Sequence, residues 1–329
     1  MAKIRMGFIG CGNIARGHMQ RLGETREAEV GALADTNLAM INKIQKAFPK
    51  LKDAKVFADY REMLDKVKLD AVGIFSPHTL HFQQAMDSLD KGLHVMLEKP
   101  MVCKVEHAKK LIAKIKEKKK VVLLSYQRHY MPAFRYMKDV ISSGKLGEVR
   151  FVSAMQSQNW YVSYRGTWRQ TQELSGGGQL NDSGSHLIDI ILWTTGLSPL
   201  EVFGYIDNVG TPVDINSAIS VKFKNGAQAT IAVVAESTTF LENITIWGTK
   251  GILFSLYDYK TLLHQKGKLN KAPEEVKLPQ PTSNPDANFI NVILKKEKNE
   301  SPPIGGLRVI ELTEAAWESG HTGKPVKVK

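Results

Sequence analysis

Short apolar runs of strand length alternate with helical patterns over the first 125 residues of the chain. The first run, residues 4–9, is followed by a segment in which Ile14, Met19 and Leu22 share one helix face. Further strands are predicted at residues 29–34, 55–57, 70–75, 93–97 and 121–125, with helical segments between most of them. Repeated strand–helix alternation predicts an α/β domain with a parallel, doubly wound sheet, whose ligands lie beyond the carboxyl ends of the strands.

Beyond about Tyr126 the pattern changes to the alternation of apolar and polar residues that is typical of half-buried strands. It predicts strands at residues 149–155, 218–223, 228–234, 243–247, 252–256 and 261–264. Helices are predicted at residues 132–142 and 307–319, and the Lys- and Pro-rich stretch 266–285 is predicted to be a surface loop. We therefore expect two domains: residues 1–125 form the parallel α/β domain, and residues 126–329 form an α+β domain with a largely antiparallel sheet.

The first strand-to-helix turn carries a glycine pattern, GCGNIA at residues 10–15. It fits G-x-G-x-x-G/A, the fingerprint of a dinucleotide-binding crossover. Gly10 allows the tight turn, Gly12 lets a pyrophosphate approach the backbone, and the free N–H groups at the helix start face the phosphates. Asp35 ends the next strand, where an acid accepts hydrogen bonds from the adenosine ribose and repels a 2′-phosphate. We therefore expect NAD as the cofactor and favour it over NADP.

Composition excludes several classes of protein. A chain of 329 residues with 43% hydrophobic residues is large enough for two domains with real cores. Its two cysteines, Cys11 and Cys103, give neither a disulfide framework nor metal-ligand spacing. No apolar run is long enough to cross a bilayer, and the N-terminus has no signal-peptide pattern. We expect a cytoplasmic protein with no membrane partner.

The formal net charge of +12 raises the question of a nucleic-acid partner. Much of the excess lies in one helical segment, residues 109–120, where Leu111, Ile112 and Ile115 keep an apolar stripe beside the lysines. The lysines are therefore predicted to form a solvated helix face. No nucleic-acid motif accompanies the lysines. We therefore expect no nucleic-acid partner and only a general attraction for anionic ligands.

The stretch from residue 176 to residue 196 concentrates candidate chemistry. It predicts a helix that stops at Gly196, with Asp182, His186 and Asp189 on one face. An acid one turn from a histidine can orient the imidazole for acid–base chemistry near neutral pH. Alternatively, Asp182 caps the helix and Asp189 ties it to a neighbouring loop. Two acids and a histidine lack a fourth ligand, so we expect no metal.

Five motifs occur in an order and spacing that resemble the Gfo/Idh/MocA family over essentially the whole chain. They are GFIGCGNIA at residues 7–15, SPHTLH at 76–81, EKP at 98–100, GGG followed by D-x-G-x-H-x-x-D from Asp182, and GTKG at 248–251. The resemblance implies an NAD(P)-dependent oxidoreductase that acts on a sugar or cyclitol hydroxyl. It also implies a Rossmann domain, a substrate domain with an open sheet, and a homodimer or homotetramer formed through that sheet.

The resemblance also implies roles for individual residues. Lys99 of EKP, Asp182 and His186 correspond to the family's catalytic group, and Lys99–Pro100 to a bond that is often cis. The residues expected to contact the cofactor are Gly10, Gly12, Asn13, Ile14, Asp35, Ser76, Pro77, His78, His81, Glu98 and Lys99. Family members usually have asparagine where this chain has His78.

Arg128, Trp168 and Arg169 are expected to contact the substrate together with Lys99, Asp182 and His186, because they lie near the domain junction or just before the glycine run. Trp160 and Tyr161 are further candidates. The alternative is that the aromatic residues are core or interface residues. Arg169 either clamps a substrate anion or pairs with an acid such as Glu173.

The expected substrate is a polyol, a sugar or a sugar derivative, from which hydride leaves to nicotinamide while His186 or Lys99 takes the hydroxyl proton. Two other functions remain open on the sequence. One is an NAD-dependent glycosidase of the same fold, and the other is a non-catalytic, nucleotide-binding sugar sensor. The presence of Lys99, Asp182 and His186 together argues against the sensor.

Overall fold

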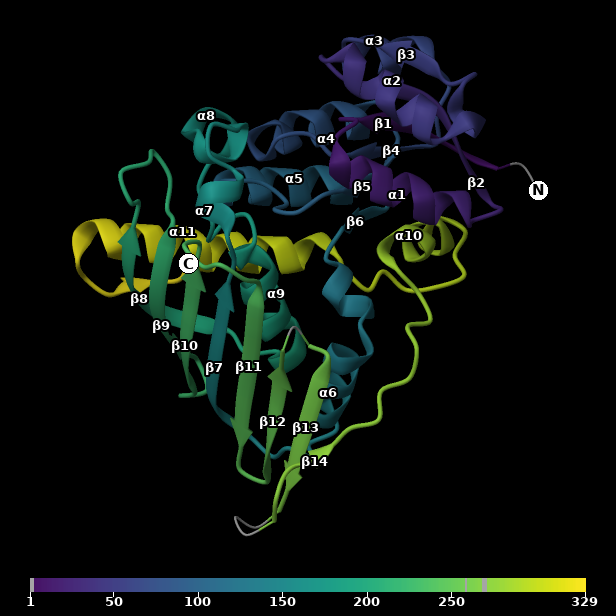
Figure 1. Cartoon of the computed structure of the whole chain (residues 1–329). Helices are drawn as coiled ribbons and strands as arrows, with labels where there is room; N and C mark the ends of the chain where they lie inside the picture. Colours follow the sequence, from purple (N-terminus) through teal and green to yellow (C-terminus); the bar gives the residue numbers. More distant parts are fainter. Residues whose placement is uncertain (1–2, 258, 268–270) are drawn as a thin grey trace. The chain divides into compact units, whose positions relative to one another are not determined.

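The computed structural model describes residues 3–257, 259–267 and 271–329 (Figure 1). The chain divides into two compact units. Unit 1 comprises Met1–Val102, Glu106–Tyr126 and Ser283–Gly306, and unit 2 comprises Cys103–Val105, Gln127–Thr282 and Leu307–Lys329. The stretch Ser283–Gly306 thus packs with the first unit, although its place in the sequence lies within the predicted second domain. Among the described residues, no helix is long and apolar enough to cross a membrane.

Unit 1 contains a six-stranded sheet in the order β3-β2-β1-β4-β5-β6. All five neighbouring pairs are parallel, which confirms the predicted doubly wound sheet. Its strands are β1 (Ile4–Ile9), β2 (Ala28–Ala34), β3 (Lys55–Phe57), β4 (Ala71–Ile74), β5 (His94–Leu97) and β6 (Val122–Leu124). Because β1, β4 and β5 are consecutive neighbours in this sheet, the residues that follow them emerge at one edge.

The helices of unit 1 follow the strands in sequence. They are α1 (Asn13–Gly23), α2 (Leu38–Ala47), α3 (Tyr60–Lys66), α4 (His81–Asp90), α5 (Val105–Lys118) and α10 (Pro285–Ile293). Short 3-10 turns lie at η1 (Pro49–Leu51) and η2 (His78–Leu80). Helix α10 comes from the far end of the chain and lies beside α1 (Figure 1). It belongs to this unit because Phe289 and Ile290 are buried in the same core as Phe8 and Leu33.

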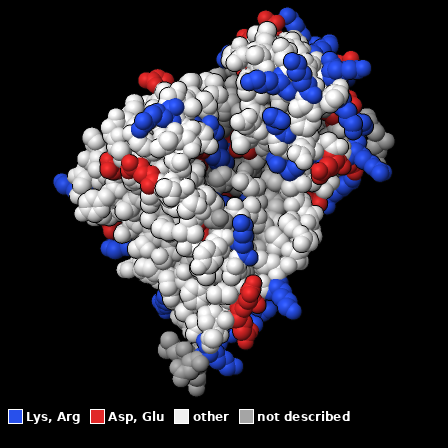
Figure 2. All heavy atoms as spheres, viewed as in Figure 1, with Lys and Arg blue, Asp and Glu red and all other residues white. Residues whose placement is uncertain are grey.

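The lysine-rich helix α5 has the solvated face that the sequence predicts. Ala108 and Leu111 are its buried residues. Lys114 and Lys118 both reach the carboxylate of Asp90, so part of the charge excess is paired locally. Figure 2 shows the lysine and arginine side chains of unit 1 interspersed with acidic ones on the face in view. Such pairs weaken the case for a continuous anion-binding surface on this helix.

Unit 2 contains a nine-stranded sheet in the order β14-β13-β12-β11-β7-β10-β9-β8-β15. Only β7 and β10 pair in parallel, and the other neighbours are antiparallel, which confirms the predicted largely antiparallel sheet. Its strands are β7 (Val149–Ser157), β8 (Pro199–Asp207), β9 (Asn216–Phe223), β10 (Gln228–Val234), β11 (Leu241–Gly248), β12 (Gly251–Leu256), β13 (Thr261–Lys266), β14 (Glu274–Glu275) and β15 (Val326–Lys327). Strands β8, β14 and β15 were not predicted. Residues 268–270 of the predicted loop at 266–285 lie outside the described residues.

The helices of unit 2 place its functional residues. They are α6 (Pro132–Ser142), α7 (Trp160–Ser163), α8 (Gln172–Ser175), α9 (Gly184–Thr195) and α11 (Pro303–Thr322), with 3-10 turns η3 (Gln127–Tyr130) and η4 (Trp168–Gln170). Helix α9 packs on β7 and on α6. Ten of its residues are buried, because the apolar run between His186 and Trp193 leaves almost no polar face.

Candidate active-site residues

The glycine turn of unit 1 has the geometry of a dinucleotide cradle. Gly10 has φ +88°, and a Cβ there would lie 2.7 Å from the carbonyl carbon of Phe75, so only glycine fits. A Cβ on Gly12 would meet nothing within 4 Å. No side chain caps the start of α1, so its first N–H groups point outward as donors. Backbone room and free donors at a helix N-terminus fit a pyrophosphate.

The carboxylate of Asp35 is held by two backbone N–H groups, one from the glycine turn and one from the segment that follows Asp35. Its Oδ2 accepts a hydrogen bond from the Cys11 N–H at 2.7 Å, and its Oδ1 accepts one from the Asn37 N–H at 2.8 Å. Each carboxylate oxygen has a second lone pair for a ribose hydroxyl. The neighbouring Thr36 and Asn37 carry no charge that would compensate a 2′-phosphate. The residues present therefore fit NAD.

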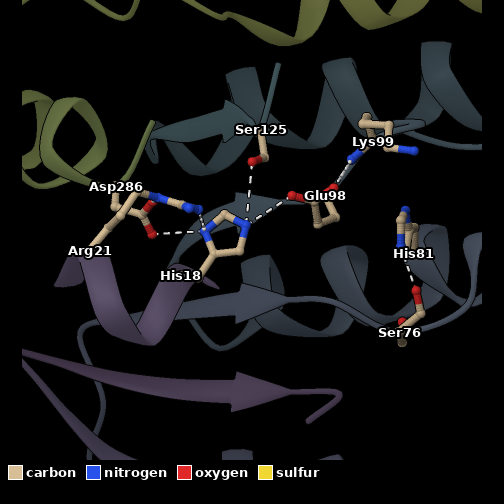
Figure 3. Close-up of polar contacts among 8 residues, drawn as sticks. All are labelled: His18, Arg21, Ser76, His81, Glu98, Lys99, Ser125 and Asp286. Atoms are coloured by element: carbon tan, nitrogen blue, oxygen red, sulfur yellow. Dashed lines mark hydrogen bonds and ion pairs between the residues drawn. The ribbon is translucent and has the colours of Figure 1, made fainter. Parts of the chain in front are cut away.

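Lys99 follows β5 in a segment held from two sides (Figure 3). Its backbone N–H donates to Oε2 of the buried Glu98 at 3.2 Å. The Lys99–Pro100 bond is cis, as the family resemblance implies. One residue further on, the carbonyl oxygen of Pro100 lies 2.8 Å from Nδ1 of His81. The backbone that carries the Lys99 side chain is thus fixed both before and after this residue.

The SPHTLH loop is tied to the same segment. His81 is fully buried, and its Nε2 lies 3.0 Å from the carbonyl oxygen of Ser76 (Figure 3). Burial is the main cause that lowers the pKa of this ring. Ser76 Oγ donates to Oε1 of Gln84 on α4 at 2.6 Å, and His78 is buried in the turn between them. The His81 ring therefore contacts the backbone of both loops, while Ser76 and Pro77 are partly exposed beside it.

In unit 2, Asp182 lies just before α9 and is buried. Its Oδ2 accepts hydrogen bonds from Trp160 Nε1 at 2.9 Å and from Arg169 Nε at 3.0 Å. His186 lies in the first turn of α9, one turn after Asp182, and is also buried. A carboxylate fixed by an arginine next to a histidine at a helix start is an arrangement suited to acid–base chemistry.

Asp189 does not share in this cluster. Its Oδ2 lies 2.7 Å from Nε2 of His129, and both side chains are buried. The His129 ring stacks on Trp193 of α9, with 4.4 Å between the ring centroids. Of the two sequence interpretations, the structure supports the one in which Asp189 ties the helix to a neighbouring segment, here η3.

Arg169 is paired with Asp182 rather than with Glu173. Its guanidinium lies over the rings of Trp168 and Tyr164, at 4.4 Å and 4.6 Å from their centroids. Within the described residues, its terminal nitrogens Nη1 and Nη2 have no hydrogen-bond partner in the protein. The stacking and the Nε bond orient these two donors, which remain available to a ligand.

Arg128 belongs to a buried polar cluster. Its Nη2 lies 2.7 Å from Glu242 Oε2, which also accepts from Gln156 Nε2 at 2.7 Å. Nη1 of Arg128 is buried and has no partner among the described residues. Glu242 was not among the predicted site residues. The sequence pattern does indicate that Glu242 is buried, because it occupies an inward position of β11 in the same alternation as Ile244 and Ile246.

A second missed residue is His18, whose ring lies between Glu98 and Asp286 (Figure 3). The helical spacing again indicates burial, since His18 falls on the buried face of α1 with Ala15, Met19 and Leu22. Cys11 and Cys103 are free thiols. Among the described residues, no group of three or more His, Cys, Asp or Glu side chains is arranged to hold a metal ion.

Comparisons with known proteins define the class. Residues 4–126 match a family model described as an oxidoreductase family with an NAD-binding Rossmann fold. Residues 134–254 match the GFO/IDH/MocA C-terminal domain. The chain therefore carries the NAD-binding Rossmann domain of an oxidoreductase family, followed by that family's C-terminal domain. It belongs to the Gfo/Idh/MocA family, as the motifs indicated.

Curated relatives are similar over part of their length. D-glucoside 3-dehydrogenase of Escherichia coli (strain K12) is 27% identical over 59% of this chain and 54% of its own. Rhizopine catabolism protein MocA of Rhizobium meliloti is 30% identical over 60% of this chain and 59% of its own. The chain thus spans between one half and two thirds of these two relatives. A solved levoglucosan dehydrogenase in complex with NADH and L-sorbose superposes over 100% of both chains with a TM-score of 0.88, and at 19% identity it shows the shared fold.

Proposed function

We propose that this protein oxidises a CH–OH group of a sugar, a cyclitol or a sugar derivative with NAD as the hydride acceptor. One observation carries the proposal: a glycine cradle completed by Asp35 occurs in a chain that also has Lys99, Asp182 and His186. The family match supports it, as do the names of two relatives, D-glucoside 3-dehydrogenase and levoglucosan dehydrogenase.

His186, Asp182 and Lys99 have separate roles in the proposed reaction. NAD, when bound, supplies the acceptor for the hydride. His186 takes the proton of the substrate hydroxyl, and the neighbouring Asp182 stabilises the charge that the ring gains. Lys99 donates a hydrogen bond to the substrate oxygen as negative charge develops there. In the alternative, Lys99 takes the proton, and an undiminished kcat in His186→Ala would identify it.

The cofactor is held by the first domain. Gly10, Gly12, Asn13 and Ile14 present the turn and the start of α1 to the pyrophosphate, and Asp35 accepts the ribose hydroxyls. The SPHTLH and EKP segments, with Ser76, Pro77, His78, His81, Glu98 and Lys99, surround the nicotinamide end. We assign His81 and Glu98 to holding the SPHTLH and EKP segments in place, because both side chains are buried.

The substrate is recognised through hydroxyl groups and through arginine. Arg169 offers Nη1 and Nη2 from a guanidinium that Trp168 and Asp182 hold in place. Arg128 offers a buried Nη1 from a cluster neutralised by Glu242. A fixed guanidinium binds two oxygens in parallel, so the substrate class extends from neutral polyols to uronates and sugar phosphates.

A substrate screen tests the proposal. The purified protein is incubated with NAD and with free sugars, inositols, uronates, sugar phosphates, nucleotide sugars and glycosides, while NADH absorbance and product formation are followed. NADH formation with a polyol supports the dehydrogenase. Release of a free sugar without net NADH identifies a glycosidase. Tight NADH binding with neither reaction across the panel identifies a sensor.

We also propose that the protein forms a homodimer or homotetramer through the sheet of unit 2. Along β7 the inward residues Val152 and Ala154 are buried, whereas Phe151 and Met155 on the other face are half-exposed. Phe151 packs edge-on against Trp247, with 5.7 Å between ring centroids. Figure 2 shows few charged side chains on the face of unit 2 in view. Aromatic and apolar residues on an open sheet face are typical of an interface between subunits.

A further inference from the structure

His18 lies between two carboxylates in unit 1. Its side chain is on the buried face of α1 and is only 1% exposed. Nδ1 lies 2.7 Å from Asp286 Oδ1, and Nε2 lies 2.9 Å from Glu98 Oε1 (Figure 3). An ionised carboxylate can only accept hydrogen bonds, so both ring nitrogens must donate. The geometry therefore requires an imidazolium.

The charges around the ring balance when the ring is an imidazolium. Arg21, also on α1, donates from Nε to Asp286 Oδ2 at 2.5 Å. Two cations, His18 and Arg21, then balance two anions, Glu98 and Asp286. Arg21 Nη2 lies 3.1 Å from His18 Nδ1 and would suit a neutral ring. However, Asp286 Oδ1 is closer to that nitrogen, at 2.7 Å, and would then face a lone pair.

The other neighbours of the ring are uncharged. Ser125 Oγ lies 3.4 Å from Nε2, and Phe75 stacks on the ring with 4.4 Å between centroids. Burial disfavours the charged ring, yet the hydrogen bonds to Asp286 and Glu98 outweigh it and raise the pKa of His18 to about 9. Burial likewise disfavours ionised Glu98, but its hydrogen bond to His18 and the charge of that ring lower its pKa to about 2. These hydrogen bonds therefore favour a charged His18 and an ionised Glu98 around neutral pH.

This cluster continues directly into the segment that carries Lys99. Glu98 binds His18 through Oε1 and the Lys99 N–H through Oε2. The same helix that carries His18 begins at the glycine turn. A rigid chain of contacts thus joins the cofactor helix to the lysine: His18 on α1, the Glu98 carboxylate, and the Lys99 backbone.

We propose that charged His18 is a positioning residue for the reaction: it fixes the Glu98 carboxylate and thereby sets where the Lys99 ammonium lies relative to the cofactor. The proposal rests on the proposed function, since it assigns Lys99 to catalysis. His18 itself touches neither substrate nor cofactor. Its loss therefore misplaces Lys99 and lowers kcat, and misplacement of a catalytic group by about 1 Å can cost on the order of 100-fold.

The first test observes the ring without any substrate. The imidazole ¹⁵N resonances of the NADH-bound protein are followed from pH 6 to pH 10, and His18 is assigned by its loss in His18→Gln. We expect two protonated nitrogens at pH 8, and a titration that moves to lower pH in Asp286→Asn. A neutral tautomer at pH 8, or a titration that Asp286→Asn leaves in place, overturns the proposal.

The second test measures the effect on Lys99. Acetylation of Lys99 by acetic anhydride, quantified by mass spectrometry against the exposed Lys91, reports the environment of the ammonium without turnover. We expect His18→Gln and Asp286→Asn to change the Lys99 rate at least about 3-fold, and His94→Gln to leave it unchanged. His94 is a suitable control because it is a half-buried histidine of the same unit that accepts from the Val121 backbone. An unchanged Lys99 rate in both variants overturns the proposal.

The third test uses turnover once a substrate is known. We expect His18→Gln to lower kcat by about 10- to 100-fold while the Kd for NADH changes less than about 3-fold. A wild-type kcat in this variant overturns the positioning role. If the screen finds no substrate, the proposed function fails by itself, and the resonance and acetylation results still decide whether His18 positions Lys99.

Discussion

At the level of single side chains, Lys99 and His186 are the two candidates for the proton that leaves the substrate hydroxyl. We expect Lys99→Ala and His186→Ala each to lower kcat by about 100- to 10,000-fold, the usual contribution of an acid–base group. The Kd for NADH should stay nearly constant. Exposed residues of the same kind, in Lys104→Ala and His321→Ala, serve as controls. An undiminished kcat in His186→Ala would assign the proton to Lys99.

Asp35 is the residue that we expect to set the choice between the two nicotinamide cofactors. Its carboxylate, fixed by the N–H groups of Cys11 and Asn37, is a ribose acceptor and a repulsive charge for a 2′-phosphate. We expect NAD to bind more tightly than NADP and Asp35→Ala to narrow or invert that difference. Titration of both nucleotides by quenching of tryptophan fluorescence measures it, with the exposed Asp53→Ala as control. A wild-type preference for NADP would contradict this assignment.

Arg169 is the residue that we expect to distinguish anionic substrates from neutral ones. Its Nε is committed to Asp182, and only Nη1 and Nη2 remain for a ligand. Lysine cannot make both contacts, so Arg169→Lys should raise KM for a uronate or sugar phosphate well above KM for a neutral sugar. Steady-state kinetics on a matched pair of substrates, with Arg165→Lys as control, measures the difference. Equal changes for both substrates would limit Arg169 to holding Asp182.

At the level of elements, the buried ion cluster fastens α10 to α1. His18 has a folded-state pKa of about 9 against an ordinary 6.5, so its stabilisation is complete below pH 6.5 and is lost as pH rises through 9. We expect the free energy of unfolding, from urea titrations, to fall over that range. Asp286→Ala should cost about 3–5 kcal/mol at pH 7, because it leaves a buried charge unpaired. A flat profile above pH 6.5 would contradict the charged ring, and Asp90→Asn on the surface is the control.

The elements also show where sequence patterns suffice. The strands β7, β9, β10 and β11 were predicted because apolar residues recur at every second position on their inward sides, such as Val152 and Ala154 in β7. Strand β8 escaped because two of its outward residues, Phe203 and Tyr205, are aromatic and an inward one is Gly204, so the alternation of apolar and polar residues is weak. Short helices such as α7, with four residues, are too brief to show a helical period.

The candidate site residues fall into two groups, those that a sequence motif identifies and those that only the tertiary fold brings together. Motif positions such as Gly10, Asp35 and Lys99 were named because a ligand dictates their type and spacing. Partners such as Glu242 and Asp286 are joined to Arg128 and His18 by the tertiary fold, at sequence distances that no local pattern covers. What the sequence does offer there is an out-of-place charge at a buried position, which signals a partner but does not name it.

At the level of the whole molecule, the aromatic residues on the outward side of β8 bear on whether subunits assemble. Tyr205 is 73% exposed and packs edge-on against Phe203, with 5.1 Å between ring centroids. Apolar residues on an open sheet face are stabilised when a second subunit covers them. We therefore expect a homodimer or larger assembly by light scattering, and expect the double variant Phe203→Lys/Tyr205→Lys to shift the mass toward the monomer.

The control for assembly is Val56→Lys, which places the same charge at an exposed apolar residue of unit 1 and should leave the mass unchanged. Circular dichroism of the double variant should match the wild type, because both side chains lie on the side of β8 that is not buried in the core. A monomeric wild type would contradict the proposed interface. A variant that keeps the full mass would assign the assembly to another surface and leave the aromatic residues of β8 without this role.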